Sequence, residues 1–173
     1  MSDAGEELRS RQAPLKERYR GDAAAAVIVL RAAASLDAAG VACRVDTGRA
    51  LVEAGLHPAT GGSGLQVCSG DMLLEALVAC AGVTLRAVAT SLDILVRDGR
   101  IEAEGDLDVR GTLGVSKEAA VGFRAIRLHV QLDTDATPEQ LATLLRLTER
   151  YCVVLQTLRV SPDVTATIAA TSA

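Results

Sequence analysis

The longest apolar stretch of the chain predicts a buried helix over about 71–91. After Asp71 the only charged side chains up to residue 90 are Glu75 and Arg86. A helix that is apolar on all sides is typical of the centre of a domain, and at 1.5 Å per residue this one spans about 30 Å. Either Ser69 or Asp71 is expected to cap its N-terminus, because both side chains accept hydrogen bonds from orphan amides.

Before this helix, short apolar stretches alternate with polar residues and predict three antiparallel strands, at 25–36, 40–48 and 49–55. Tight turns at 37–40 and 46–48 join them. The following segment, 56–70, is expected to be a loop. It contains the glycine-rich sequence TGGSG, which no Lys-Ser/Thr pair follows, so we interpret it as a flexible turn and not as a phosphate-binding loop.

Period-two alternation returns after the helix. In the segment 92–111, Ile101 and Ala103 alternate with glutamates, which predicts a strand with one exposed face, whose partner is expected at 93–97. A second alternating stretch covers 123–133. The C-terminal sequence DVTATIAA, at 163–170, is rich in β-branched residues and is expected to close the fold as a strand.

Two helices are expected between the last strands. The segment 137–152 opens with Thr137 as N-cap and Pro138 at the first helical position, and its leucines share one face. The sequence CVVLQTL, at 152–158, predicts a short final helix. Strands, a buried helix, further strands and a helix pair together indicate an α+β fold.

The N-terminal segment is charged and differs from the rest. Residues 1–20 are expected to form a loose arm with a short helix at 14–20, because Pro14 interrupts the helical pattern. Residues 21–173 are expected to form a single domain, because a chain of this length is long enough to enclose one sizeable core.

The composition narrows the function classes. Hydrophobic residues make up 49% of the 173 residues and aromatics only 2%, so the core consists of Ala, Val and Leu. A net charge of −4 without a basic stripe argues against nucleic-acid binding. No window reaches the roughly 18 uncharged apolar residues that a membrane span needs, and the charged start is not a signal peptide. We therefore expect a cytoplasmic protein with neither a nucleic acid nor a membrane as partner.

The chain has four cysteines and two histidines. No two cysteines form a CxxC pair, and neither paired zinc spacing nor an HExxH motif is present. We therefore predict no metal and no cofactor. The residues in question are Cys43, Cys68, Cys80, Cys152, His57 and His129.

Cys80 lies in the middle of the buried helix, which raises the question of its chemistry. A cysteine reacts with peroxide as the thiolate, and apolar burial opposes ionisation. The helix dipole fades within the first turn, and Asp71 is nine residues away, so activation requires a cation from elsewhere. The alternative is that each cysteine packs as a small hydrophobic residue, which free cysteines commonly do. Only the fold decides whether Cys152 lies close enough to form a disulfide with Cys80.

Two segments that contain cysteines resemble a known protein family. The sequence CSGDMLLEALVACAGVTLRAVA, at 68–89, followed by TERYCVVLQTL, at 148–158, resembles osmotically inducible protein C (OsmC) and the organic hydroperoxide resistance proteins. The sequence at 48–64 also looks like the hairpin and glycine loop that precede these segments in the family. The resemblance extends over about 48–170.

The resemblance implies an intertwined homodimer, in which curved antiparallel sheets enclose long central helices. It also implies thiol-dependent reduction of organic hydroperoxides, with Cys80 as the peroxidatic and Cys152 as the resolving cysteine. In the family an arginine from the N-terminal sheet stabilises the thiolate. Arg49 is the candidate here, and Arg44 and Arg31 are the nearby alternatives. A dithiol such as a dihydrolipoyl group is the reductant that the family suggests.

The chain departs from the family pattern at two positions. Gly70 stands where active members commonly carry a glutamate, with Asp71 next to it as a candidate replacement, and Val153 stands where they carry proline. We therefore expect slow peroxidase activity, which Gly70→Glu combined with Val153→Pro would raise. Cys68 is interpreted as a loop residue that packs, with a third redox-active thiol as the alternative.

A non-catalytic protein of the same fold is the competing hypothesis. It would sense oxidants, or bind a small hydrophobic ligand, without efficient turnover. The third hypothesis is a structural dimer whose cysteines only fill the core.

Overall fold

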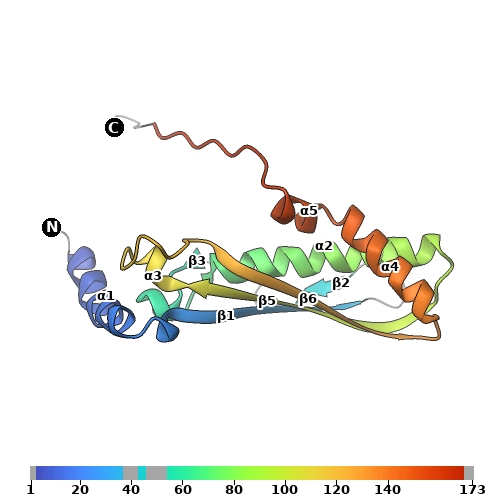
Figure 1. Ribbon diagram of the computed structural model, residues 1–173, viewed down its shortest axis with the longest axis horizontal. Coiled ribbons are helices and arrows are strands. Elements are labelled where there is room, and N and C mark those ends of the chain that lie inside the picture. The colour runs from blue at the N-terminus through green and yellow to red at the C-terminus, as the bar shows by residue number, and fades with distance from the viewer. Residues whose placement is uncertain (1–2, 37–42, 46–53, 170–173) are drawn as a thin grey trace.

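The structure is a computed structural model that describes residues 3–36, 43–45 and 54–169. Its centre is a four-stranded antiparallel sheet with the strand order β2-β1-β5-β6. The helix α2 lies along one face of this sheet, and two further helices cover the other side of α2 (Figure 1). The elements of the sheet and its cover are β1 (Val27–Leu36), β2 (Cys43–Val45), α2 (Ser69–Ser91), β5 (Val96–Asp108), β6 (Phe123–Thr134), α4 (Pro138–Tyr151) and α5 (Val153–Arg159).

The central helix confirms the predicted buried element and extends it by two residues. α2 runs over Ser69–Ser91, and its N-cap is Cys68, whose side chain makes no capping hydrogen bond. The prediction of a Ser69 or Asp71 cap is therefore wrong, because both residues already lie inside the first turn. By length and composition α2 is apolar enough to cross a membrane, but half of its apolar window is buried in the protein, which is typical of a core helix.

The main core forms where α2 meets the sheet. Leu74, Leu77 and Val78 are fully buried, and Leu85 is nearly so. Arg86 is also buried, and its Nη1 donates a hydrogen bond of 2.6 Å to the Val96 carbonyl. This bond ties the end of α2 to the first residue of β5. The sharp turn between them has Asp93 in the left-handed region, with φ of 54°.

The alternation in β5 predicted the exposed and buried faces correctly. Ile101 and Ala103 are fully buried, whereas Glu102 and Glu104 lie on the opposite face. β5 pairs with β1 on one side and with β6 on the other. The expected partner at 93–97 is wrong, because this segment supplies the turn after α2 and the start of β5 itself.

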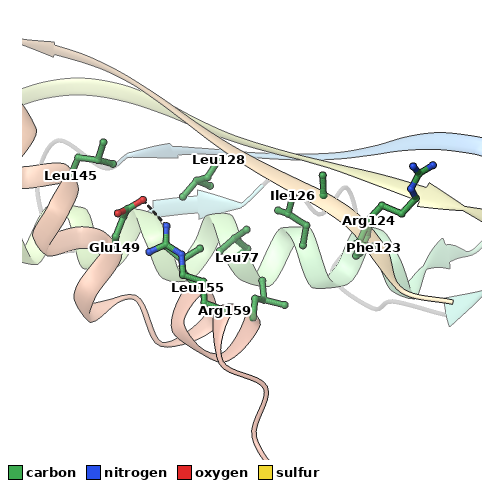
Figure 2. Close-up of a pocket in the computed structure, with 11 residues that line it drawn as sticks. Leu77, Phe123, Arg124, Ile126, Leu128, Leu145, Glu149, Leu155 and Arg159 are labelled. Atoms are coloured by element: carbon green, nitrogen blue, oxygen red, sulfur yellow. Dashed lines mark hydrogen bonds and ion pairs between the residues drawn. The ribbon is translucent and has the colours of Figure 1, made fainter. Parts of the chain in front are cut away.

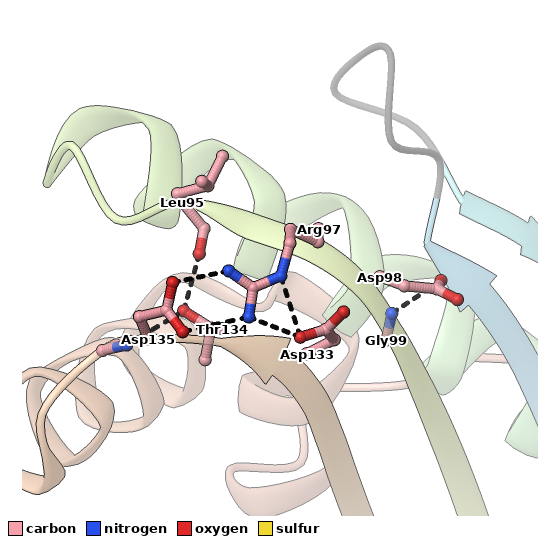
Figure 3. A network of polar contacts seen from close by, with 8 residues as sticks. Leu95, Arg97, Asp98, Gly99, Asp133, Thr134 and Asp135 are labelled. Carbon is pink, nitrogen blue, oxygen red and sulfur yellow. Dashed lines mark hydrogen bonds and ion pairs between the residues drawn. The ribbon is translucent and has the colours of Figure 1, made fainter.

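An ion-pair cluster joins β5 and β6 at one end of the sheet (Figure 3). The Arg97 guanidinium lies 2.6 Å from carboxylate oxygens of both Asp133 and Asp135, and the Thr134 hydroxyl donates to the Leu95 carbonyl at 2.6 Å. These carboxylates hydrogen-bond a guanidinium, which lowers their pKa values. The three charged side chains are exposed to solvent, so the cluster fixes register more than it adds stability.

The predicted N-terminal hairpin is confirmed in part. β1 pairs with β2 in antiparallel register, with Ala34 opposite Val45. The third strand was expected at 49–55 as an antiparallel partner of the first two. Of this segment the structure describes Ala54–Gly55, which form β3 and pair in parallel with β4 (Val67–Cys68). The rest of that segment lies outside the described residues.

The glycine-rich loop is a tight structure and not a flexible turn. It follows the 3-10 helix η2 (Pro58–Thr60), and the Gly62 amide donates to the His57 carbonyl at 3.1 Å. Gly61 has φ of 91°, which favours glycine, and a Cβ at Gly62 would lie 1.6 Å from the Leu56 carbonyl oxygen. Both glycines are therefore required by the local backbone.

The N-terminal segment is a docked helix and not a loose arm. α1 covers Asp3–Gly21 with Pro14 inside it. The Tyr19 hydroxyl donates to the Ala59 carbonyl at 2.8 Å, and the Gln12 amide donates to the Thr60 carbonyl at 3.0 Å. Tyr19 is buried in a second small core that also contains the short helices η1 (Ala24–Ala26) and α3 (Val109–Thr112). This tertiary contact offsets the cost of an interior proline, which is about 3 kcal/mol.

The two C-terminal helices were predicted correctly. α4 has the expected capping box at Thr137, and α5 follows directly. The prediction of a closing strand at 163–170 is wrong for a single chain. Residues 160–169 form no strand and extend away from the body (Figure 1). Their strand-forming side chains have no partner strand within the described residues.

Candidate active site

Cys80 lies at the boundary between the buried and exposed sides of α2. On the core side, Leu77, one turn before Cys80, and the adjacent Ala81 are buried, whereas Ala76 and Val83, each about one turn away, are exposed. The thiol itself is partly buried and packs against the main core. This position gives the sulfur both apolar surroundings and access from one side.

Cys152 is held at the junction between α4 and α5. It is fully buried, and it serves as both the C-cap of α4 and the N-cap of α5. Its amide donates to the Thr148 carbonyl, and its carbonyl accepts from the Gln156 amide, each at 2.9 Å. An ion pair of 2.8 Å between Glu149 and Arg159 further joins the two helices. The backbone around Cys152 is therefore fixed from both sides.

The fold brings the two thiols together, although they are 72 residues apart in sequence. The Cys152 thiol donates a hydrogen bond to the Cys80 sulfur. Burial, together with this bond and the negative charge of Cys80, raises the pKa of Cys152 to about 11. Cys152 thus stays protonated at neutral pH, with its proton directed at Cys80.

The pKa of the Cys80 thiol is shifted in the opposite direction, below its usual value. Burial opposes its ionisation, but hydrogen bonds from the Val154 amide, the Cys152 thiol, the Thr84 hydroxyl and the Val153 amide outweigh burial and lower the pKa of the Cys80 thiol. These donors favour the charged form, because a thiolate is a better hydrogen-bond acceptor than a thiol. Cys80 is therefore the thiol of this pair that ionises first.

Three of these donors were missed by the sequence analysis. Thr84 lies four residues after Cys80, so helical periodicity places the two side chains on the same face and was a usable signal. The amides of Val153 and Val154 carry no sequence signal. They reach Cys80 only because α5 begins beside α2.

Within the described part of the chain, the hydrogen-bond donors to the Cys80 sulfur do not include the arginines or the aspartate that were predicted to activate it. Arg49, the expected thiolate-stabilising residue, lies outside the described residues, and the structure describes Arg31 and Arg44 as members of β1 and β2. Asp71 is nine residues before Cys80, about 13 Å along the helix axis. Its pKa is raised by burial, and the charge of His57 opposes this shift.

The remaining cysteines belong to other elements. Cys68 is half-buried, packs against the main core and lines a separate small cavity beside His57. Cys43 belongs to β2. Among the described residues, no group of three or more histidine, cysteine or acidic side chains is arranged to hold a metal ion.

The sequence matches the model of a known protein family. The model of the family described as OsmC-like protein matches residues 62–167, a range that contains both thiols. The chain belongs to the OsmC-like family. This family identification covers α2, β5, β6, α4 and α5, and it leaves α1 and the first hairpin outside the matched range.

A solved structure shows the same fold. It is the crystal structure of an OsmC-like hydroperoxide resistance protein from Jannaschia sp. CCS1, with a TM-score of 0.62 and 15% sequence identity. The superposition covers 84% of this chain and 95% of that one. No curated protein matches the sequence significantly. At this identity the likeness establishes the OsmC-like fold.

Proposed function

We propose that this OsmC-like protein is a thiol-dependent peroxidase that reduces organic hydroperoxides. The observation that carries the proposal is the contact between Cys80 and Cys152, whose pKa values are shifted in opposite directions. A peroxidatic cysteine needs a thiolate, and a resolving cysteine needs to lie within reach of it. A structural neighbour that is named a hydroperoxide resistance protein supports the same assignment.

The chemistry proceeds in two balanced steps. The Cys80 thiolate attacks the terminal peroxide oxygen, the O–O bond breaks, and the alkoxide takes up a proton and leaves as an alcohol. Cys80 is then a sulfenic acid. The Cys152 sulfur attacks the Cys80 sulfur, which forms the disulfide and releases water. An external dithiol restores both thiols by exchange and is itself oxidised to a disulfide.

Cys152 gains reactivity after the first step. The Cys80 thiolate raises the pKa of Cys152 through its charge and through the hydrogen bond that it accepts. Both contributions end when Cys80 becomes a neutral sulfenic acid, and only burial still opposes ionisation. Cys152 therefore ionises more readily once Cys80 has been oxidised to the sulfenic acid.

The surface beside Cys80 favours an apolar substrate. Met72 and Val83, which flank Cys80 along α2, are 38% and 42% exposed. The same surface supports a homodimer, because contiguous exposed apolar side chains on a helix commonly mark an interface. The cytoplasm is the proposed compartment, since a reducing environment keeps both thiols free.

The proposal is tested by adding one equivalent of cumene hydroperoxide to the reduced protein and counting free thiols. We expect the loss of two thiols per chain, located at Cys80 and Cys152 by mass spectrometry. Cys80→Ser should abolish peroxide consumption, whereas Cys152→Ser should leave a sulfenic acid that dimedone traps. An unchanged thiol count would instead support a structural role for the cysteines.

The alternative is a redox sensor or ligand-binding protein that uses the same two thiols without turnover. The departure at Gly70 favours slow chemistry and keeps this function as the second candidate. Multiple turnovers with a dithiol such as dihydrolipoamide identify a peroxidase. A single stoichiometric oxidation followed by no further peroxide consumption identifies a sensor.

A further inference from the structure

The hydroxyl of Thr148 is a buried polar group that the structure leaves without a hydrogen bond. Thr148 is 2% exposed, and within the described part of the chain its Oγ1 has no hydrogen-bond partner. A buried hydroxyl has given up its hydrogen bonds to water, so an unsatisfied one costs stability. Such a group is explained when a second state of the protein, other than the one with free thiols, makes use of it.

Thr148 lies one helical turn before Cys152 on the buried side of α4. Leu144, Thr148 and Cys152 follow one another at intervals of four residues, and each is at most 2% exposed, so they form one line along the helix. The Cys152 amide donates to the Thr148 carbonyl at 2.9 Å, which keeps this C-cap residue in helical register. At this spacing the two Cβ atoms lie about 5–6 Å apart. Rotation about χ1, for which threonine has two populated states in helices, therefore brings the hydroxyl towards the Cys152 sulfur.

The neighbouring residue, Glu149, belongs to a different side of α4. It lines a cavity of about 450 Å³ and forms an ion pair of 2.8 Å with Arg159 of α5 (Figure 2). The line that contains Thr148 instead packs in the main core against α2, along which α4 runs back towards Cys80 (Figure 1). The group that acts on Cys152 by its charge is Cys80 on α2. The free hydroxyl therefore lies on the side of α4 that holds the thiols.

The demand for a further donor arises when Cys80 is oxidised. While both thiols are free, Cys152 is a thiol whose proton is directed at the Cys80 sulfur. Burial is the largest cause that raises the pKa of Cys152 to about 11, and it persists after Cys80 has become a neutral sulfenic acid. Cys152 then has to ionise in a buried position before it attacks, and a hydroxyl that donates to its sulfur favours the thiolate.

We propose that Thr148 is a further catalytic residue, whose hydroxyl donates a hydrogen bond to the Cys152 sulfur in the second step, after Cys80 has become the sulfenic acid. This inference rests on the proposed peroxidase function. In that step Cys152 loses its proton, its sulfur attacks the Cys80 sulfur, and the S–O bond breaks. The departing hydroxide takes up the proton and leaves as water, while the Thr148 hydroxyl keeps its own proton. Thr148 thereby joins the Val154 and Leu155 amides as a donor to Cys152.

The experiment is a single turnover of the full-length protein and of three variants, with one equivalent of cumene hydroperoxide and no reductant. Samples are quenched at successive times with dimedone and iodoacetamide, and mass spectrometry separates the Cys80 sulfenic acid from the disulfide. Thr148→Val removes the hydroxyl at nearly constant shape, and Thr148→Ser keeps it. Thr143→Val makes the same change at a partly buried position of α4 outside the line, and it is the matched control.

Thr148→Val should slow disulfide formation at neutral pH at least about tenfold, because a hydrogen bond to a charged group is lost. The oxidation of Cys80 itself should be nearly unchanged, so its sulfenic acid accumulates although Cys152 is present. Thr148→Ser should restore most of the rate of disulfide formation, and Thr143→Val should behave as the parent protein. The melting temperature of Thr148→Val should not fall, because a methyl group replaces a hydroxyl that has no partner in the described structure.

The pH profile of disulfide formation separates this role from a structural one. A donor favours the charged form, so its loss raises the pKa of Cys152 in the protein whose Cys80 is oxidised. The rise of the rate with pH should therefore move to higher pH in Thr148→Val, and the difference from the parent should shrink where Cys152 is ionised in both proteins. A structural defect would slow the step equally at every pH.

The two steps are measured separately, so failure of this inference is distinguishable from failure of the proposed function. Normal oxidation of Cys80 with equal disulfide formation in the parent and in Thr148→Val would overturn the inference alone. A slowing that is the same at every pH, or that Thr148→Ser shares, would also overturn it. A parent protein whose Cys80 the peroxide does not oxidise would overturn the peroxidase proposal and this inference together.

Discussion

At the scale of single residues, the chemistry rests on the donors around one sulfur. Cys80 ionises more readily than an ordinary thiol although burial opposes it, because four hydrogen bonds point at its sulfur. Two of these come from backbone amides, which are fixed dipoles and need no reorganisation when charge develops. In the proposed peroxidase, the start of a helix and a neighbouring hydroxyl would therefore activate Cys80.

Thr84→Val is expected to raise the pKa of Cys80, because a hydrogen bond to the charged form of the sulfur is lost. Since only the thiolate reacts, the rate of Cys80 alkylation by iodoacetamide rises with pH through this pKa and then levels. The variant should shift that rise to higher pH. Thr84→Ser keeps the hydroxyl and serves as control. Identical pH profiles for the valine variant and the parent would exclude a role for this hydroxyl.

Val153→Pro is expected to slow the reaction of Cys80 several-fold. This reverses the expectation from the family pattern that proline at this position raises the activity, because the Val153 amide donates to the Cys80 sulfur and proline has no amide hydrogen. Val153 is the first residue of α5, where proline is well tolerated, so the fold should be retained. Stopped-flow measurement of peroxide consumption, with Val153→Ala as control, gives the comparison. A faster proline variant would show that backbone rigidity matters more than the donor.

At the scale of secondary-structure elements, α4 shows how a helix positions Cys152, the proposed resolving cysteine. Its capping box fixes where it begins, and its buried leucine side fixes how it packs on α2. Leu144 is 1% exposed, whereas Leu141, three residues earlier, is 36% exposed. The helix thus has a core side that stabilises the fold, and Cys152 ends it.

Leu144→Ala is expected to reduce the free energy of unfolding by about 2–5 kcal/mol, through lost burial and the cavity that remains. Leu141→Ala removes the same atoms from a half-exposed position and should cost about 1 kcal/mol or less. Urea denaturation followed by circular dichroism measures both. Equal losses for the two variants would mean that α4 does not pack as the structure shows.

At the scale of the whole molecule, a single chain leaves much apolar surface uncovered. The exposed side of α2 has Met72, Ala76, Val83 and Ala87 in a continuous line beside Cys80. Lone surface leucines or valines are normal, but a line of apolar side chains along a central helix is typical of an interface. A second copy is the partner that the family resemblance implies.

Val83→Glu is expected to weaken the homodimer at least about tenfold, because an unpaired buried charge opposes association. Val83 is 42% exposed, so the single chain should tolerate the substitution. Arg146→Glu, at an exposed position of α4, is the control. Sedimentation velocity at low micromolar concentration measures the association state. A wild-type protein that is monomeric and folded under these conditions would contradict the homodimer.

The sequence by itself determined the elements with strong periodicity. The apolar run of α2, the alternation of Ile101 and Ala103 with glutamates, and the Thr137 capping box each predicted a local structure that the fold contains. Local propensity and burial pattern agree in these segments, so the signal is present in neighbouring residues. The roles assigned to the two cysteines rest on the family resemblance of the segments that flank them, and they stay a prediction.

Only the tertiary structure decided how these elements meet. Pro14 predicted a broken helix, but the contacts of Tyr19 and Gln12 with the loop at Ala59 and Thr60 stabilise an unbroken one. The C-terminal segment 163–169 has the residues of a strand, yet strand formation requires a partner, which no local pattern reveals. The reactivity of Cys80 likewise depends on amides some 70 residues away. Hydrogen bonds between distant segments have no periodicity in the sequence, which is the physical reason why the site could be located but not described from the sequence alone.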